Sequence, residues 1–314
     1  MVLSLRSGIH PEIGWALDRL CRLCDNEQFL LRTIPGLTDA LFEWPEWYAS
    51  KGFKDVTQFQ SLFAPNPYQA QKRRHALESL FVLRNAALNE PNALELANHS
   101  HTVPLILTAL HNLESDSDET TEFILHIIEL LQAVAFKFVI PSPSEKTNPL
   151  PPLQRIASQS SNRSLIIASL TALTLILSNP HNAIQVNPDS SALQASIRYL
   201  PLFIDKPLVD ACLNYLYMHI SHTSMAKAFL FHSEMASVLK LLVNLLLTEQ
   251  VEETVTLDVT GTIHTTPSLT VATRHHELTK EELDNLVEKP EPQRCYEWYW
   301  SYLHSLDVSL SLFS

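Results

Sequence analysis

Apolar positions recur along most of the chain with the three-to-four-residue spacing of amphipathic helices. In the first such stretch, five side chains at offsets of 0, 4, 7, 8 and 11 residues share one helical face: Ile13, Leu17, Leu20, Cys21 and Cys24. Pro11 suits the first turn of this helix, because a residue there needs no backbone N–H. We therefore predict a helix whose two cysteines point into a core as small apolar side chains.

The same pattern predicts further helices, joined by short polar or proline-marked loops. The ranges predicted to be wholly or partly helical are 34–48 (ended at Pro45), 70–88, 91–98, 104–113, 120–140, 162–179, 190–201, 205–222 and 231–249. Residues 50–68 are predicted to be a loop. Residues 141–152 contain five prolines in twelve positions, which predicts an exposed loop there too.

Two of these helices are apolar on nearly all sides and begin 43 residues apart, at Leu165 and Leu208. Armadillo and HEAT repeats have about 40 to 47 residues, and helices apolar on several faces suit the inner layer of such a stack. The sequence therefore predicts an all-α, armadillo/HEAT-like solenoid over residues 1–249. A single helical bundle is the alternative architecture.

The composition changes near residue 250, where Thr and Val become frequent. We predict a linker or a β-hairpin over residues 250–277, with Gly261 in the turn. Residues 278–314 are predicted to form a C-terminal helical segment. Its first helix begins at Thr279, with Glu282 completing a capping box.

Overall composition excludes several classes of protein. Only 5 of 314 residues are glycine, which argues against Rossmann folds and P-loops. The formal net charge of −12 opposes binding to the DNA backbone, and the basic run at 71–75 is interpreted as a solvated helix face. The longest apolar run, 165–177, is too short for a membrane span of about 20 residues. Because no signal peptide is recognisable, we expect a soluble, intracellular protein.

No pattern of catalytic or metal-binding residues stands out. The histidines that lie close together in sequence form three pairs: His99 and His101, His219 and His222, and His275 and His276. None has the further ligands that zinc requires, and the chain has no GxSxG motif. We expect no enzymatic activity, no metal and no cofactor. A helical enzyme or regulatory domain with a metal site at the histidines remains the alternative from a different class.

Two aromatic clusters are candidates for a partner interface, since Trp and Tyr are enriched in binding hot spots. The first surrounds Pro45 and the second lies in a predicted helix over 292–307; their members are Trp44, Trp47 and Tyr48, and Tyr296, Trp298, Tyr299 and Trp300. The same residue types also pack in cores. A core position is favoured for the first cluster, whereas the second fits a core and an interface equally well.

Four stretches together resemble one family: SLRSGIHPEIGWALDRLCRLC, NEQFLLRTIPGLTDAL, LESLFVLRNAALNEPNALELANH and KPEPQRCYEWYW. They are similar to the armadillo-like region of the ARID-containing subunits of SWI/SNF-type chromatin remodellers, of the RSC and PBAF type. The resemblance implies a non-catalytic nuclear scaffold whose partners are other subunits of a remodelling complex.

The resemblance also bears on one residue and on one domain. An Asn on the third helix of such repeats often lines the concave face, and Asn85 matches it by position, although a structural cap is an equal interpretation. Family members commonly carry an ARID domain, which has no counterpart here, so direct DNA binding is not expected. The rival hypothesis is a cytoplasmic armadillo or HEAT adaptor that binds peptide segments.

Overall fold

The computed structural model describes residues 1–54 without 25 and 27, 67–140 without 116, 148–183, 190–230 without 203, and 237–243. Every regular element in these ranges is helical, so the described part of the chain is all-α, as predicted. The chain forms two compact units, Met1–His219 and a second that begins at Ile220. The predicted linker 250–277 and the segment 278–314, with the second aromatic cluster, lie outside the described residues.

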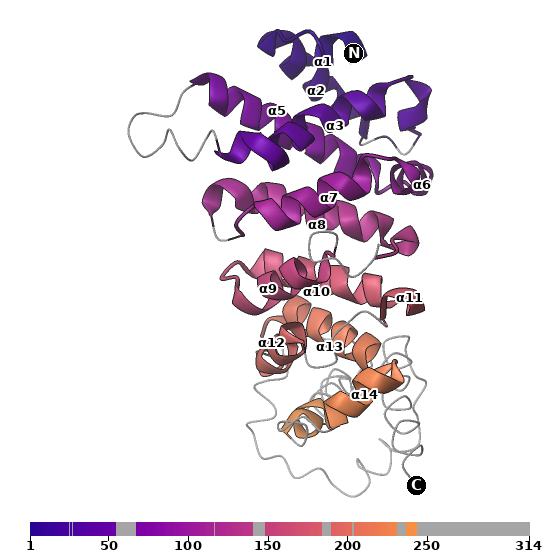
Figure 1. Cartoon of the computed structure of the whole chain (residues 1–314), viewed down its shortest axis with the longest axis vertical. Coiled ribbons are helices and arrows are strands. Elements are labelled where there is room, and N and C mark those ends of the chain that lie inside the picture. The colour runs from indigo at the N-terminus through magenta and orange to yellow at the C-terminus, as the bar shows by residue number, and fades with distance from the viewer. Residues whose placement is uncertain are drawn as a thin grey trace, which may run out of the picture. The chain divides into compact units, whose positions relative to one another are not determined.

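The first unit contains most of the described helices (Figure 1). In chain order these are α1 (Val2–Leu5), α2 (His10–Cys24), the 3-10 turn η1 (Leu31–Thr33), α3 (Leu37–Trp47), the π-helical turn η2 (Tyr48–Gly52), α5 (Pro67–Ala86), α6 (Glu90–Asn98), α7 (Thr102–Asn112), α8 (Asp118–Val134), the 3-10 turn η3 (Ala135–Lys137), α9 (Leu150–Gln159), α10 (Arg163–Leu177), α11 (Pro180–Ala183), α12 (Ser191–Tyr199) and α13 (Lys206–Ile220). In the second unit, α14 (Thr223–Leu230) and residues 237–243 are helical.

Four long helices of the first unit contact one another in chain order. Helix α2 packs on α5, α5 on α8, and α8 on α10. A second set lies against them, with α3 on α5, α7 on α8 and α9 on α10, and α12 joins α9. Figure 1 shows these helices succeeding one another in the order of the sequence. Contacts therefore run mainly between elements that are close in the sequence.

Helix α10 illustrates why the long helices are so apolar. Asn162 caps it, since its Oδ1 accepts hydrogen bonds from the backbone N–H groups of Ser164 and Leu165. Helices α8 and α9 both cover α10, and nine of its fifteen residues are buried as a result. Each fully buried Leu or Ile stabilises the fold by about 1.5–3 kcal/mol. Helix α10 is thus apolar on nearly all sides because two neighbouring helices cover it.

Two buried asparagines bind the backbone of an earlier segment in the same way. Oδ1 of Asn92, on α6, accepts a hydrogen bond from the N–H of Leu31 (3.0 Å), and its Nδ2 donates to the carbonyl of Phe29 (2.8 Å). Asn182, on α11, is 0% exposed. Its Oδ1 accepts from the N–H of Ile140 (2.8 Å), and its Nδ2 donates to the carbonyl of Phe138 (2.8 Å). We call these contacts the asparagine clamps.

The clamps join equivalent parts of the stack. The segment bound by Asn92 follows α2, and Asn92 itself follows α5, the neighbour of α2. The segment bound by Asn182 follows α8, and Asn182 follows α10, the neighbour of α8. Asn182 lies 90 residues after Asn92. Each clamp therefore ties the turn after one long helix to the turn after the next.

Several predicted elements are confirmed and several are wrong. The helices predicted at 70–88, 91–98, 104–113, 162–179, 190–201 and 205–222 are present with shifted ends. The helix at 120–140 ends earlier, at Val134. Helix α9 begins at Leu150, inside the predicted loop 141–152. Two of the loop prolines stand in its first turn, where proline is tolerated because the N–H has no helical partner.

The prediction that Pro45 ends a helix is also wrong. Helix α3 runs through Pro45 to Trp47 and continues as η2 to Gly52, inside the predicted loop 50–68. The proline ring is buried, and the Nδ2 of Asn112 on α7 donates to the carbonyl of Ala49 (3.0 Å), a group in the widened turn. Packing of the buried ring offsets the hydrogen bond that the proline removes, and the Asn112 amide satisfies a carbonyl of the widened turn that follows.

The cysteines are less buried than predicted. Helix α2 buries Ile13, Ala16, Leu17 and Leu20, whereas Cys21 and Cys24 are half-buried. The Sγ of Cys24 lies 3.6 Å from the carbonyl of Val82 on α5. Both thiols therefore lie at the edge of the α2–α5 contact.

The clamps should contribute strongly to stability. We expect Asn92→Ala and Asn182→Ala each to lower the free energy of unfolding by about 1–3 kcal/mol, because each leaves a buried peptide N–H and carbonyl without a partner. Urea denaturation followed by far-UV circular dichroism measures the loss. Asn98→Ala is the matched control, since Asn98 is exposed. Equal effects of all three substitutions would contradict the role of the clamps.

Candidate protein-interaction surface

The first aromatic cluster lies at the end of α3 and divides into a buried and a half-exposed part. Tyr48 is 1% exposed, and its ring lies 4.8 Å from that of Phe123 on α8. Trp44 and Trp47 are half-buried and meet edge to face at 6.0 Å. Tyr48 thus occupies the core, whereas the two indoles are partly accessible to a partner.

Side chains of α2 and α5 complete this surface. The Nζ of Lys72 lies 4.4 Å from the ring centroid of Tyr68 and 5.5 Å from that of Trp47, distances typical of cation–π contacts. His10 Nδ1 and His75 Nε2 share a hydrogen bond of 3.0 Å. The ring of Trp44 lies 5.6 Å from that of His75. We call Trp44, Trp47, Tyr68, Lys72, His10 and His75 the aromatic–basic cluster.

The environment of His10 disfavours its protonated form. Burial is the main cause of a lowered pKa, and the nearby His75 and Lys72 lower the pKa of His10 further by charge repulsion. The other ring nitrogen of His75, Nδ1, lies 3.9 Å from Oε2 of Glu78. The burial of His75 and the single shared hydrogen bond make the pair a fixed link between α2 and α5.

Asn85 lies on α5, away from that cluster, and is half-buried. Its Oδ1 accepts a hydrogen bond from Nη1 of Arg84 (2.7 Å). Arg84 also pairs through Nε with Glu129 on α8 (2.8 Å), which in turn lies 3.2 Å from Nδ1 of His126. Asn85 is therefore part of a polar chain along the α5–α8 contact, and its side-chain carbonyl is already engaged.

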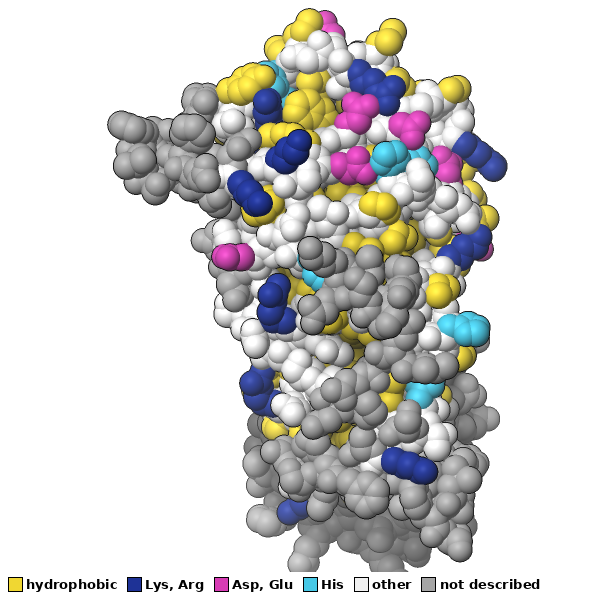
Figure 2. Space-filling model, in the orientation of Figure 1, with side chains coloured by type: hydrophobic (Ala, Val, Ile, Leu, Met, Phe, Trp, Pro, Cys, Tyr) yellow, Lys and Arg dark blue, Asp and Glu magenta, His cyan; other side chains and the backbone are white. Residues whose placement is uncertain are grey.

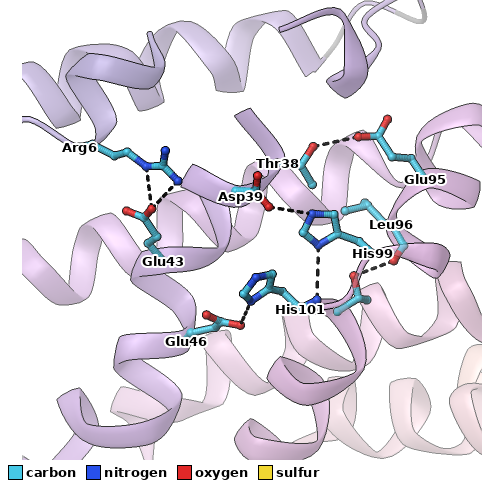
Figure 3. A network of polar contacts seen from close by, with 10 residues as sticks. Arg6, Thr38, Asp39, Glu43, Glu46, Glu95, Leu96, His99 and His101 are labelled. Carbon is cyan, nitrogen blue, oxygen red and sulfur yellow. Dashed lines mark hydrogen bonds and ion pairs between the residues drawn. The ribbon is translucent and has the colours of Figure 1, made fainter. Parts of the chain in front are cut away.

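A third polar group joins α3 to the turn between α6 and α7 (Figure 3). His99 Nε2 lies 3.2 Å from Asp39, and His101 Nδ1 lies 2.7 Å from Glu46. The ring of Phe42 stacks on His99 at 4.9 Å and contacts His101 at 5.8 Å. Figure 2 shows carboxylates and histidines side by side on this face. Both histidines thus hold the turn against α3.

The histidines and cysteines were also considered as ligands of a metal ion or as catalytic groups. Among the described residues no group of three or more His, Cys, Asp or Glu side chains is arranged to hold a metal ion. Cys212 is buried, and burial raises the pKa of its thiol to about 12, which suppresses the reactive thiolate. His275 and His276 lie outside the described residues.

Sequence reasoning found the two tryptophans but missed their surroundings. Lys72, His75 and His10 come from segments that are distant in sequence, and no local pattern links them to Trp44. The clamps were missed as well, although a signal exists. Both asparagines precede an alanine and follow a proline closely, as Pro91-Asn92-Ala93 and Pro180-His181-Asn182-Ala183.

The sequence of this all-α chain was compared with those of known proteins. No family model matches the chain. The chain is similar to the chromatin structure-remodeling complex subunit rsc9 of Schizosaccharomyces pombe, with 23% identity over 300 residues, 95% of this chain and 37% of rsc9. It thus spans little more than a third of that relative's length. In the described ranges no helix is long and apolar enough to cross a bilayer.

Two glycines provide a test of the packing around Trp47. A Cβ on Gly52 would lie 2.7 Å from the Trp47 ring, whereas a Cβ on Gly14 would meet only His75, at 3.9 Å. We expect Gly52→Ala to destabilise the protein by about 1–3 kcal/mol and to change the tryptophan fluorescence. Gly14→Ala, inside α2, should be neutral or stabilising by up to about 1 kcal/mol. Urea unfolding and emission spectra compare the two, and identical behaviour would contradict the packing described.

His10 should make stability depend on pH. The pKa of His10 is lowered in the folded state from 6.5, so its contribution to stability is complete above pH 6.5 and is lost as the pH falls through the folded pKa. His10→Gln should therefore reduce the acid-side slope of the unfolding free energy. Urea titrations at several pH values test this, and an unchanged slope would contradict it.

Proposed function

We propose that this chain is a non-catalytic scaffold subunit of a SWI/SNF-type, RSC-like chromatin-remodelling complex, and that it acts in the nucleus through protein–protein contacts. The observation that carries the proposal is the similarity to rsc9 along 95% of the chain. A shared domain in one region would align over a short stretch, whereas this alignment covers 300 of the 314 residues.

The packing supports a solenoid built from armadillo-like repeats. Long helices contact their successors, and the two asparagine clamps lie 90 residues apart, which is twice a repeat length of about 45. Such stacks offer extended surfaces for partners. This is the architecture expected of a subunit that positions others.

The aromatic–basic cluster is the candidate contact region of this scaffold. It offers half-buried indoles, an exposed Tyr68 and a cation held over aromatic rings, which is the composition enriched in interface hot spots. Asn85 and the second cluster, Tyr296, Trp298, Tyr299 and Trp300, are further candidates. Partners would be other subunits of the complex rather than nucleic acid or membrane.

The peptide-binding adaptor is the second candidate function. It requires an asparagine whose side-chain amide is available to bind a peptide backbone. The carbonyl of Asn85 is bonded to Arg84, which is itself paired with Glu129, so a peptide would compete with an existing contact. The polar chain along α5 and α8 thus favours the scaffold.

Affinity purification from the native cell tests the proposal. We expect the tagged chain to recover a remodelling ATPase and its companion subunits at near-stoichiometric levels, as measured by quantitative mass spectrometry. Trp47→Ala should reduce that recovery, because it removes a large accessible contact surface. Phe136→Ala is the matched control, since Phe136 is an exposed aromatic residue outside the cluster.

The outcomes separate the two functions. If no remodelling subunits are recovered by the wild-type chain, the scaffold proposal is wrong. If Asn85→Ala abolishes binding of an extended peptide that the wild-type chain retains, the adaptor is the better account. Circular dichroism of each variant establishes that the helices remain folded.

A further inference from the structure

Helix α1 packs on α2 at the N-terminal end of the first unit, and the part of α2 around Trp15 remains exposed. One side of α2 buries Ile13, Leu17 and Leu20 and packs on α5. On the opposite side the Trp15 side chain is 52% exposed. Two other apolar side chains near the start of the chain are also exposed, Ile9 at 52% and Leu3 at 86%, and Figure 2 shows hydrophobic groups at this end. The terminal repeat of a stack usually presents a polar outer face, so this exposure calls for a partner.

Two residues of opposite charge flank Trp15 on this face. Glu12 lies three residues before it and Arg19 four residues after it, a spacing that places all three on one helical stripe. The stripe extends to Gly8 on one side and to Arg22 on the other. Glu12 and Arg19 are both exposed, and neither is in an ion pair or hydrogen bond with another described residue. Arg22 pairs with Asp18 at the edge of the stripe (3.1 Å).

We propose that this stripe binds a second copy of the same chain, with the two α2 helices antiparallel about a two-fold axis between Trp15 and Ala16. In that arrangement Glu12 of each copy faces Arg19 of the other, and the two indoles meet next to the axis. Arg22 of each copy then lies near Ile9 of the other copy. The contact is self-complementary, so it closes at two copies.

Charge complementarity favours a second copy of the chain as the partner and an antiparallel arrangement of the two α2 helices. A parallel pair would place Glu12 against Glu12 and Arg19 against Arg19, which is unfavourable. An antiparallel pair makes two opposite-charge contacts from the same residues. Exposed ion pairs contribute little net energy, so burial of Trp15 and the neighbouring apolar groups stabilises the dimer and the charges set its orientation.

This inference rests on α2 alone and is independent of the proposed scaffold function. A dimer can form whether or not the chain enters a remodelling complex, and a monomeric chain can still be a subunit. Failure of one proposal therefore leaves the other in place.

The experiment measures the mass of the purified full chain by sedimentation equilibrium over a wide concentration range. We expect the 35.5 kDa chain to approach twice that mass as its concentration rises. Glu12→Arg alone and Arg19→Glu alone should each weaken self-association by at least about tenfold, a change of about 1.4 kcal/mol, because each creates two like-charge contacts. Trp15→Ala should weaken it as well.

Mixing the two charge variants gives the decisive result. In the mixture, one chain carries Glu12→Arg and the other carries Arg19→Glu. At one contact the two substituted residues meet with opposite charges. At the other contact the unchanged Arg19 of the first chain meets the unchanged Glu12 of the second. A mixture should therefore form a heterodimer although neither variant forms a homodimer. Glu122→Arg is the control, since it makes the same charge change at an exposed site on α8 and should leave the association constant unchanged.

Three outcomes overturn the proposal. A wild-type chain that stays monomeric at every concentration shows that the face does not bind a second copy. A dimer that all α2 variants retain uses another surface. A mixture of the two charge variants that stays monomeric excludes the antiparallel pairing. Circular dichroism keeps these outcomes distinct from unfolding of a variant.

Discussion

The packing of the long helices depends on one constraint: the turns that follow α2 and α8 carry peptide groups that buried asparagine side chains bind. At Phe29–Leu31 and at Phe138–Ile140 the backbone is not part of a helix ladder, and a buried asparagine amide binds it at both its donor and its acceptor. A buried peptide group without a partner costs about 1–3 kcal/mol, so apolar side chains could not replace these amides. With the turns fixed, α2, α5, α8 and α10 pack through their apolar faces in order.

This arrangement decides which side chains remain available to a partner. A long helix with neighbours on two sides keeps only a narrow stripe, where polar groups such as Arg84 and Glu129 pair between α5 and α8. The end of α3 is different, because Trp47 there is only half-buried and its ring lies 5.5 Å from Nζ of Lys72. The proposed binding surfaces thus lie where the regular helix is interrupted, as at the end of α3, or at the N-terminal end of the first unit, as at α2.

The sequence was informative where the physics is local. Helices with an apolar stripe longer than ten residues, such as α2 and α10, were predicted with nearly correct bounds, since burial on one or two faces dictates the pattern. Proline misled in both directions: Pro45 stays inside a helix because packing offsets its lost hydrogen bond, and two prolines of the predicted loop 141–152 begin α9. The aromatic–basic cluster and the clamps unite residues about 30 to 65 positions apart, which no periodicity reveals. Trp44, Trp47 and Tyr48 were located, and the structure divides them between core and surface.

The central claim is that the chain works as part of a larger nuclear assembly, and sedimentation of a native nuclear extract tests it most directly. We predict that the chain, detected by antibody, moves in a glycerol gradient with a remodelling ATPase, far ahead of a free 35.5 kDa protein or its dimer. Depleting the ATPase should then remove the chain from those fractions. Sedimentation of the chain as a free monomer or dimer, unaffected by the depletion, would contradict the account.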